Sequence, residues 1–526
     1  MSCLEELERA LDDPDEEVHS EAIAAIGQRG SDLIHSGLLA RWSSMARRLL
    51  GEPFEVRKRL LEVVEWQLRH GNPTGEERTT LSRLERELSG DSFSDRLRRV
   101  VGAWDYELEV AGLGDGQEAI RELAAYSFEN IDELEAELPW LLGSEANSGF
   151  SFGKELGAID GDLDLLPVLL GHWENDISDD RFVTGYLAGA KERRGTEWLE
   201  ENLDTWATDP GKSLLVATTT WRVLPTTRAS RRIALLIEDG SLAPRFLGHL
   251  VWGFWARDLP PADVSNLVAA TSADTSGTAV FARLAFLEQY IVQRPETLEE
   301  LRAVAEQTLW ESAEHDFGTM DGHRWRRLAE VVLADDPVEM ARLGTFLAQR
   351  AAEGAGRVDD EIQQVLSIAL AAADVPEQNK ILEDILGPAL ESIPGFLWVL
   401  ESPFERDLLN HMDPELVVRW VEQDIEARLR LVAYAVPVGG QPLAGLARTL
   451  LVRFGDREDV RSALGATFGT GGWVGSEADW IEGKLRQLDK WAQDPQPNVR
   501  RWAVELRAGY RRRLDRARLL EEEDET

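Results

Sequence analysis

Cysteine is almost absent from this sequence, and so is any long run of apolar residues. The chain contains one cysteine, Cys3, which excludes disulfide frameworks and zinc sites built from several thiolates. The residues from Met1 to Arg9 are charged and amphipathic, and they lack the apolar core of a secretory signal. The most apolar stretch, residues 247–256, is about half as long as the roughly 20 residues that cross a bilayer. We therefore expect a cytoplasmic protein without a membrane span.

Basic residues are also scarce, and lysine most of all. Lys plus Arg total 57 against 96 Asp plus Glu, which gives a formal net charge of -39 and a pI near 4.6. The lysines are Lys58, Lys154, Lys191, Lys212, Lys380, Lys484 and Lys490. An acid excess with so little lysine is typical of proteins from salt-in halophiles, where molar salt shortens the range of charge repulsion to about 3 Å. A GC-rich genome that favours arginine codons is the alternative explanation for the lysine deficit.

The acidity also bears on the class of binding partner. Proteins that coat nucleic acids neutralise phosphates with many cations, and a net charge of -39 opposes such binding. A local basic patch would still allow it. We therefore expect protein partners and treat nucleic acid as the less favoured choice.

Apolar residues recur at helical spacing along nearly the whole chain. Val417, Val421 and Ile425 are one example, each four residues from the next. Sustained alternation of apolar and polar residues, which marks half-buried strands, is hard to find. Loop-forming groups such as Gly71–Gly75 and Pro437–Pro442 interrupt the pattern at intervals that suit helix hairpins. Because 526 residues are too many for one ordinary core, the sequence predicts an all-α protein that grows by adding helix pairs.

Three predicted helix starts share one pattern, in which Asp-Pro is followed by three residues and then valine. They are Asp13-Pro14 with Val18, Asp413-Pro414 with Val418, and Asp494-Pro495 with Val499. Aspartate can cap the free amides of a first turn, and proline suits the first helical position because it has no amide hydrogen to leave unpaired. The pattern resembles the second helix of a HEAT repeat, a family of stacked helix pairs. The resemblance implies an alpha-solenoid.

HEAT-like units are about 40 to 47 residues long, so Asp413 and Asp494 lie about two units apart. This spacing and the changes in composition divide the chain into five segments. They are amino-terminal HEAT-like repeats (1–111), degenerate helical repeats (112–335), further HEAT-like repeats (336–464), a Gly/Trp loop with Arg-rich capping helices (465–519) and an acidic tail (520–526).

Partial motifs for nucleotide and calcium binding are present, but each is incomplete. Gly211-Lys212-Ser213 resembles the end of a phosphate-binding loop, yet Trp206 occupies the position where that loop needs another glycine. Residues 160–164 carry three aspartates that resemble the opening of a calcium loop. Leu165 stands where that loop needs a turn glycine. We read both segments as turns between helices.

Clusters of histidine and acidic residues have the chemistry of metal ligands but no motif spacing. They occur at residues 172–180 and 314–323. In so acidic a chain, such clusters arise from composition alone. No nucleophile elbow, zinc-protease helix or Cys-His pair is evident. We therefore expect no enzymatic activity, no cofactor and no metal ion.

The carboxyl-terminal region gathers tryptophan and arginine. These residue types are the most enriched at interface hot spots, which predicts a surface for a partner. Tryptophans can instead form aromatic core between stacked helices, and the arginines of a last helix can face acidic neighbours as a cap. The sequence leaves both interpretations open. The candidate interaction residues are Trp473, Trp480, Trp491, Trp502, Arg500, Arg501, Arg511, Arg512 and Arg513.

The same region carries a second resemblance. Phe468–Ser476, Trp480 and Trp491–Ala503, followed by an Arg-rich helix and a glutamate tail, resemble the close of long helical regions in prokaryotic antiviral defence proteins. Ser151–Asp160 is similar to another part of such regions. An enzyme domain, such as a nucleotide-switching ATPase, usually accompanies the helical part in these systems. The resemblance implies that any effector here is a separate chain.

Taken together, these features predict a non-enzymatic helical-repeat scaffold that mediates protein–protein interaction as a component of a prokaryotic defence system. The alternative is a nucleic-acid-associated helical-repeat protein that uses the carboxyl-terminal arginines. A metal-dependent hydrolase centred on His315, Asp316 and His323 is a third and weaker option.

Overall fold

The structure is a computed structural model in which every regular element of the described residues is a helix. These residues are 3–103, 116–174, 177–223, 226–252, 254–354, 360–392, 408–436, 438, 443, 445–469 and 475–524. They form two compact units, Met1–Leu242 and Ala243–Thr526. The boundary between the units lies inside the segment 112–335, for which the sequence predicts degenerate repeats. The prediction of an all-α chain is confirmed.

The helices of the first unit are α1 (Cys3–Ala10), α2 (Glu16–Gln28), α3 (Gly30–His35), α4 (Leu39–Arg48), α5 (Phe54–His70), α6 (Gly75–Ser89), α7 (Phe93–Val101), α9 (Gly116–Glu129), α10 (Ile131–Leu141), α11 (Gly149–Ile159), α12 (Leu165–His172), α13 (Arg181–Arg194), α14 (Thr196–Trp206), η1 (Pro210–Lys212), α15 (Ser213–Val223) and α16 (Thr227–Glu238).

The helices of the second unit are η2 (Pro244–Trp252), η3 (Phe254–Asp258), α17 (Pro261–Ala270), α18 (Gly277–Gln293), η4 (Pro295–Thr297), α19 (Leu298–Ala313), α20 (Thr319–Val332), α21 (Pro337–Ala352), α22 (Asp360–Ala372), α23 (Val375–Ile381), η5 (Leu382–Leu386), α24 (Gly387–Ser392), η6 (Leu408–His411), α26 (Pro414–Gln423), α27 (Ile425–Ala435), α28 (Gly445–Phe454), α29 (Glu458–Gly469), α30 (Glu477–Trp491) and α31 (Pro497–Asp524).

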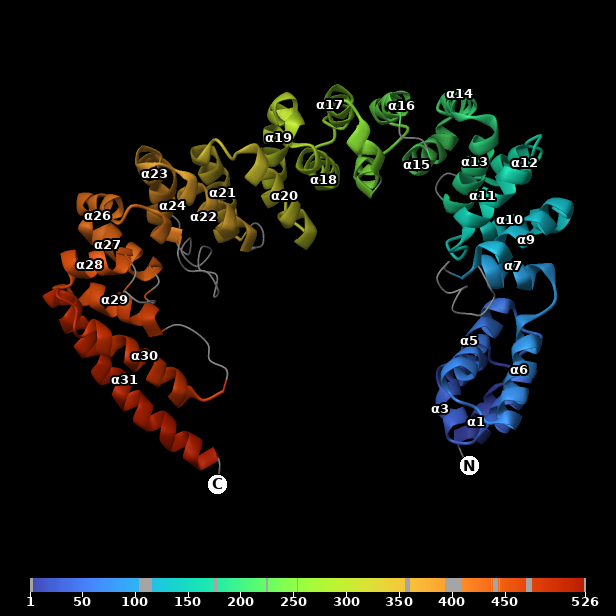
Figure 1. Ribbon diagram of the computed structural model, residues 1–526, viewed down its shortest axis with the longest axis horizontal. Helices are drawn as coiled ribbons and strands as arrows, with labels where there is room; N and C mark the ends of the chain where they lie inside the picture. Colours follow the sequence, from blue (N-terminus) through green and yellow to red (C-terminus); the bar gives the residue numbers. More distant parts are fainter. Residues whose placement is uncertain are drawn as a thin grey trace. The chain divides into compact units, whose positions relative to one another are not determined.

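Within each unit, helices pack on elements that are close to them in the chain (Figure 1). In the first unit, α5 packs on α6 and α2, and α11 packs on α9 and α13. In the second, α18 packs on α19, α20 and η2, and α30 packs on α31. No extensive contact in the described part of either unit joins helices from distant parts of the chain. Such local packing is the defining property of a helical-repeat array.

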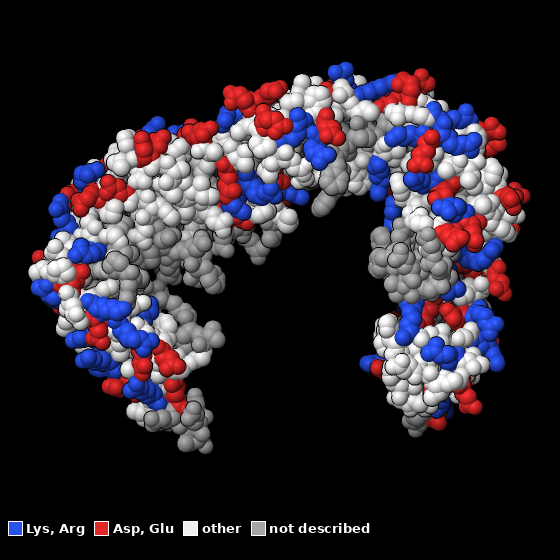
Figure 2. Space-filling view, viewed as in Figure 1, with Lys and Arg blue, Asp and Glu red and all other residues white. Residues whose placement is uncertain are grey.

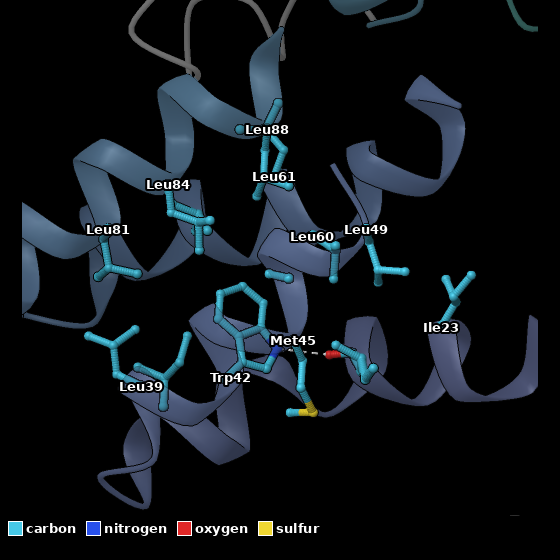
Figure 3. Packing of buried hydrophobic residues seen from close by; sticks show 14 of the residues in the cluster. Ile23, Leu39, Trp42, Met45, Leu49, Leu60, Leu61, Leu81, Leu84 and Leu88 are labelled. Atoms are coloured by element: carbon cyan, nitrogen blue, oxygen red, sulfur yellow. Dashed lines mark hydrogen bonds between the residues drawn. The ribbon is translucent and has the colours of Figure 1, made fainter. Parts of the chain in front are cut away.

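The core of the first helices is built around Trp42 of α4 (Figure 3). Its indole ring is fully buried, and its Nε1 donates a hydrogen bond to the carbonyl oxygen of Ile26 at 3.1 Å. Leu60 of α5 and Leu84 of α6 are also fully buried in this cluster. Burial of each such leucine contributes about 1.5–3 kcal/mol, so these apolar stripes hold the amino-terminal helices together.

One of the three predicted Asp-Pro starts begins its helix as the sequence pattern predicts. Asp413 caps α26, because its Oδ1 accepts the amide of Glu415 at 2.9 Å, and Val418 one turn later is fully buried. Asp336 is not among the predicted starts, because Ala341 stands where the pattern needs valine, but it also caps a helix, α21, by accepting the amide of Glu339 at 3.0 Å. Proline follows each aspartate at the first helical position.

The other two predicted starts are wrong by two residues. Helix α2 begins at Glu16 with Asp15 as its cap, because the Asp13 carboxylate accepts the amide of Asp15 at 3.0 Å and forms a turn instead. Val18 is consequently 37% exposed and does not enter the core. Helix α31 begins at Pro497, since a second proline downstream of Asp494 takes the first position. The pattern marks helix starts, but neighbouring Asp and Pro residues decide the register.

Glycines let α11 and α13 approach at backbone distance. Gly153 and Gly157 on α11 face α13, and Gly185 and Gly189 on α13 face α11. A Cβ atom at Gly153 would lie inside contact distance of the Phe182 carbonyl oxygen and 2.8 Å from the Tyr186 nitrogen. At Gly189 it would overlap the Lys154 carbonyl. Only glycine fits this helix crossing.

A buried carboxylate fixes the loop that follows α11. Asp160 is 1% exposed and accepts hydrogen bonds from the amides of Asp164 and Leu165 at 3.1 and 2.9 Å. It also accepts the Tyr186 hydroxyl at 2.5 Å, which ties the loop to α13. Burial, followed by the contact with Asp160, raises the pKa of Tyr186. The aspartates of residues 160–164 thus include a structural anchor.

Ion pairs between neighbouring helices use many of the arginines. In the visible face of Figure 2, basic and acidic side chains are interspersed over both units. Burial raises the pKa of Asp204, but hydrogen bonds from Arg232 and Arg228 outweigh it and hold the pKa below its usual value. The pKa of Glu426 is lowered by Arg457. These pairs stabilise the fold above the unfolded pKa of each carboxylate, and that contribution is lost as pH falls through the lowered folded pKa.

We expect the melting temperature to rise with monovalent salt well beyond the point at which a neutral protein levels off. The physical reason is the net charge of -39, because folding brings together carboxylates whose repulsion salt screens. The measurement is the melting temperature at pH 7 from about 0.1 to about 3 M KCl. A flat or falling curve would mean that the acidity is neutralised locally, and the halophile hypothesis would be dropped.

A low-salt melt at about pH 5 separates repulsion from pairing. Carboxylates with lowered pKa values, such as Asp204 and Glu426, stay ionised at this pH and keep their pairs. Carboxylates held under repulsion alone have raised folded pKa values, so their protonation favours the fold. We therefore expect a higher melting temperature at pH 5 than at pH 7 in low salt.

Candidate interaction surface

The last two helices form an antiparallel hairpin. Ser476 caps α30 by accepting the amide of Asp479 at 3.1 Å, and its hydroxyl donates to Glu521 near the end of α31 at 2.9 Å. Glu521 also accepts the amide of Ala478 at 3.2 Å, and the bonds from Ala478 and Ser476 lower its pKa. The acidic residues that follow position 520 therefore begin as the last turns of α31, which runs to Asp524.

The hairpin encloses an aromatic core. Trp491 of α30 and Trp502 of α31 are 4% and 1% exposed, and their rings stack with centroids 5.8 Å apart. Phe468 of α29 lies 5.3 Å from Trp491, and Tyr510 lies 5.5 Å from Phe468. The Trp502 Nε1 donates to the carbonyl oxygen of Arg461 at 3.0 Å. In the folded chain, Trp491 and Trp502 are core residues of the hairpin rather than surface residues.

Trp480 is half-buried and holds two cations over its ring. The Arg513 guanidinium lies 5.1 Å and the Lys484 ammonium 5.4 Å from the centre of the Trp480 ring. Lys484 also donates to the carbonyl oxygen of Phe468 at 2.9 Å, and burial lowers the pKa of Lys484. Trp480 thus closes the side of the aromatic core. Trp473 lies outside the described residues.

Most of the α31 arginines have partners inside the protein. Arg500 donates to the carbonyl oxygens of Asp494 and Pro495, each at 2.7 Å, and so closes the turn before the helix. The other pairs are Arg501 with Asp456 at 2.5 Å, Arg507 with Asp489 at 2.8 Å, Arg513 with Glu477 at 2.6 Å and Arg518 with Glu482 at 2.5 Å. These arginines tie α31 to its neighbours.

Three further arginines lie on the opposite side of α31. Arg511, Arg512 and Arg516 are exposed and have no acidic partner among the described residues. At about 100° per residue they turn away from the buried stripe that includes Tyr510 and Ala517. Val504 and Leu519, 44% and 59% exposed, lie between them. We call the set Val504, Ala508, Arg511, Arg512, Arg516 and Leu519 the outer face of α31.

The structure separates the predicted arginines into two groups. Arg500, Arg501 and Arg513 are exposed but engaged within the chain, whereas Arg511 and Arg512 are exposed and available. Sequence reasoning missed Arg516 and the two apolar residues of the outer face. Helical spacing from Arg512 would have found Arg516, which lies four residues later.

The histidines of the second predicted cluster contact aromatic and acidic side chains of neighbouring helices. His315 lies against the ring of Phe281, with centroids 6.1 Å apart, and His323 lies 3.7 Å from Glu361. Among the described residues, no group of three or more His, Cys, Asp or Glu side chains is placed to hold a metal ion. None of the helices in the described part of the chain has the length and hydropathy of a membrane span.

Comparison with known proteins gives one structural match. No protein-family profile and no curated protein matches this chain. A solved structure described as a circular tandem repeat protein with novel repeat topology and enhanced subunit contact surfaces is 15% identical in sequence. The alignment covers 98% of this chain and 96% of that chain, with a TM-score of 0.17. A TM-score this low transfers neither arrangement nor function, and the helical-repeat description rests on the packing above.

Proposed function

We propose that this chain is a non-enzymatic, HEAT-like helical-repeat scaffold whose outer face of α31 binds an acidic protein partner. The local packing of successive helices and the capped Asp-Pro starts of α21 and α26 support the HEAT-like part. The absence of a complete catalytic motif from the sequence supports the non-enzymatic part. The defence context rests on the sequence resemblance of the carboxyl-terminal region.

The arginines of the outer face carry the proposal. In a chain of net charge -39, Arg511, Arg512 and Arg516 remain without an acidic partner in the described residues, although their neighbour Arg513 is paired. Arginine is favoured at interfaces because its planar group bonds carboxylates in a fixed geometry. Val504 and Leu519 would add apolar contact area between the charges. An acidic surface with small apolar patches fits this face.

Affinity capture from the native host at native salt tests the proposal. We expect a protein partner in stoichiometric amount, identified by mass spectrometry, and its retention after nuclease treatment. The variant R511E/R512E/R516E should lose this partner by at least tenfold, because the face would repel an acidic surface. The matched control R78E/R83E/R419E reverses three exposed arginines elsewhere that also have no acidic partner in the described part of the chain, and it should keep the captured protein.

Two outcomes would contradict the proposal. Turnover of a substrate by the purified chain alone would remove the non-enzymatic assignment. Loss of the captured material after nuclease treatment, with binding that weakens steeply as salt rises, would favour the nucleic-acid alternative, because phosphate contacts release counterions. The same arginines serve either partner, so the nuclease step decides between the two.

A further inference from the structure

The first helices and the greater part of α31 carry opposite charge. From Pro497 to Leu520, α31 has eight arginines against the acidic residues Glu505 and Asp515. From Cys3 to Glu21, the first helices have nine acidic residues against Arg9. The part of α31 before position 521 is therefore basic in an otherwise acidic chain, and the helix closes with the acidic residues Glu521–Asp524.

The acidic end presents its charges on an exposed helix face. On α2, the buried residues Ala22, Ile23 and Ile26 face the core, and helical spacing places Glu17 and Glu21 on the opposite side. Both glutamates are exposed and have no basic partner among the described residues, and the same holds for Glu16 at the start of the helix. Val18, 37% exposed, lies beside them.

The outer face of α31 is complementary in charge to the exposed glutamates of α2. The outer face of α31 carries three exposed arginines without acidic partners in the described chain, and the exposed Val504 and Leu519 lie among them. In a chain of net charge -39, a surface with three exposed arginines and no acidic partner in the described residues is suited to bind an acidic surface.

We propose that the outer face of α31 binds the exposed side of α2 that carries Glu17 and Glu21, together with Glu16 at the start of that helix, on a second copy of this chain. The proposal rests on the proposed function, since it names the acidic partner of the outer face. Each arginine would meet a glutamate, and Val504 and Leu519 would pack near Val18. The contact joins two different surfaces, so it is heterologous and leaves a free end on each copy for the next.

Sedimentation velocity over a protein concentration series tests this contact. The full chain is studied at the lowest KCl concentration at which its far-UV circular dichroism is that of the folded protein. We expect the average mass to rise above 58.9 kDa with concentration and to return toward that of one chain as KCl is raised. A mass that stays at one chain throughout, or that grows with salt, would overturn the proposal.

Charge reversal at each end gives the specific test. R511E/R512E/R516E and E16R/E17R/E21R should each weaken self-association by at least tenfold, whereas R78E/R83E/R419E should associate like the natural chain. A mixture of the first two variants should associate again, because the glutamates placed on α31 of one variant can pair with the arginines placed on α2 of the other. If the mixture stays dissociated while circular dichroism shows that both variants are folded, the proposed contact between α31 and α2 is wrong.

The outcomes also separate this proposal from the proposed function. A chain that is monomeric in solution but loses a captured protein on R511E/R512E/R516E substitution overturns self-association and leaves the scaffold function standing. Retention of every captured partner by that variant would overturn the function assigned to the outer face.

Discussion

Substitution of Gly189 by alanine is expected to destabilise the first unit by about 3 kcal/mol. The new Cβ would overlap the Lys154 carbonyl and lie 2.7 Å from the Ala158 nitrogen, so α11 and α13 would have to separate. Overpacking of a tight interior costs about 1–3 kcal/mol, and backbone is less able to yield than a side chain. The intrinsic helix preference of alanine returns only about 1 kcal/mol. The double variant G153A/G189A should fail to form the α11–α13 pair.

A second glycine-to-alanine change provides the control. Gly509 lies in the interior of α31, and a Cβ atom there would meet open space, because apart from its chain neighbours and the nearby backbone of its own helix no atom lies within 4 Å. G509A should therefore stabilise the second unit by about 0.5–1 kcal/mol through helix propensity alone. Urea unfolding followed by circular dichroism gives the two midpoints. If G189A and G509A shift stability in the same direction, the close crossing of α11 and α13 is wrong.

Replacement of Arg232 by alanine is expected to cost about 3–5 kcal/mol. Arg232 of α16 is 4% exposed and pairs with Glu200 of α14, which is 3% exposed, and its Nε donates to Asp204 at 2.7 Å. Thr226 donates its hydroxyl to the same Glu200 carboxylate. Removal of the guanidinium leaves a buried carboxylate without its counter-charge, which is the costly way to break a buried pair.

The double variant R232M/E200M tests whether the cost comes from the orphaned charge. Apolar replacement of both members of a buried pair is often neutral, so the double variant should recover most of the stability that R232A loses. R228A serves as the control. Arg228 also pairs with Asp204 but is 41% exposed, so its loss should destabilise the protein much less than the loss of Arg232 does. A double variant as unstable as R232A would contradict the buried-pair explanation.

The sequence predicts the class of fold well because helical spacing is a local property. The apolar stripe that includes Val417 and Val421 forms the buried side of α26, as its period indicates. Asp413 and Asp336 cap helices because a short carboxylate side chain can accept an amide of the first turn, and the proline that follows suits the first helical position. The residue at which a helix begins is harder to predict, since Asp15 caps α2 although Asp13 fits the sequence pattern.

Contacts between helices are not encoded in such local signals. The glycine spacing of α11 is visible in the sequence, but its partner on α13 becomes clear only when the two backbones are placed together. The pair of Arg232 and Glu200 joins residues on different helices, and nothing near either residue indicates the other. Likewise, a row of arginines in the sequence cannot distinguish Arg513, which is paired, from Arg512, which is not. Neighbouring helices decide which cations are free.

Arginine-directed labelling of the captured complex tests the central claim most directly, namely that the outer face of α31 is where the partner binds. Free and partner-bound chains are treated with phenylglyoxal at native salt, digested with a protease that does not cleave at arginine, and compared by mass spectrometry. We expect Arg511, Arg512 and Arg516 to be modified in the free chain and protected in the complex, while Arg78 and Arg83 are modified in both. Equal modification of the three α31 arginines in the free and bound chains would contradict the account.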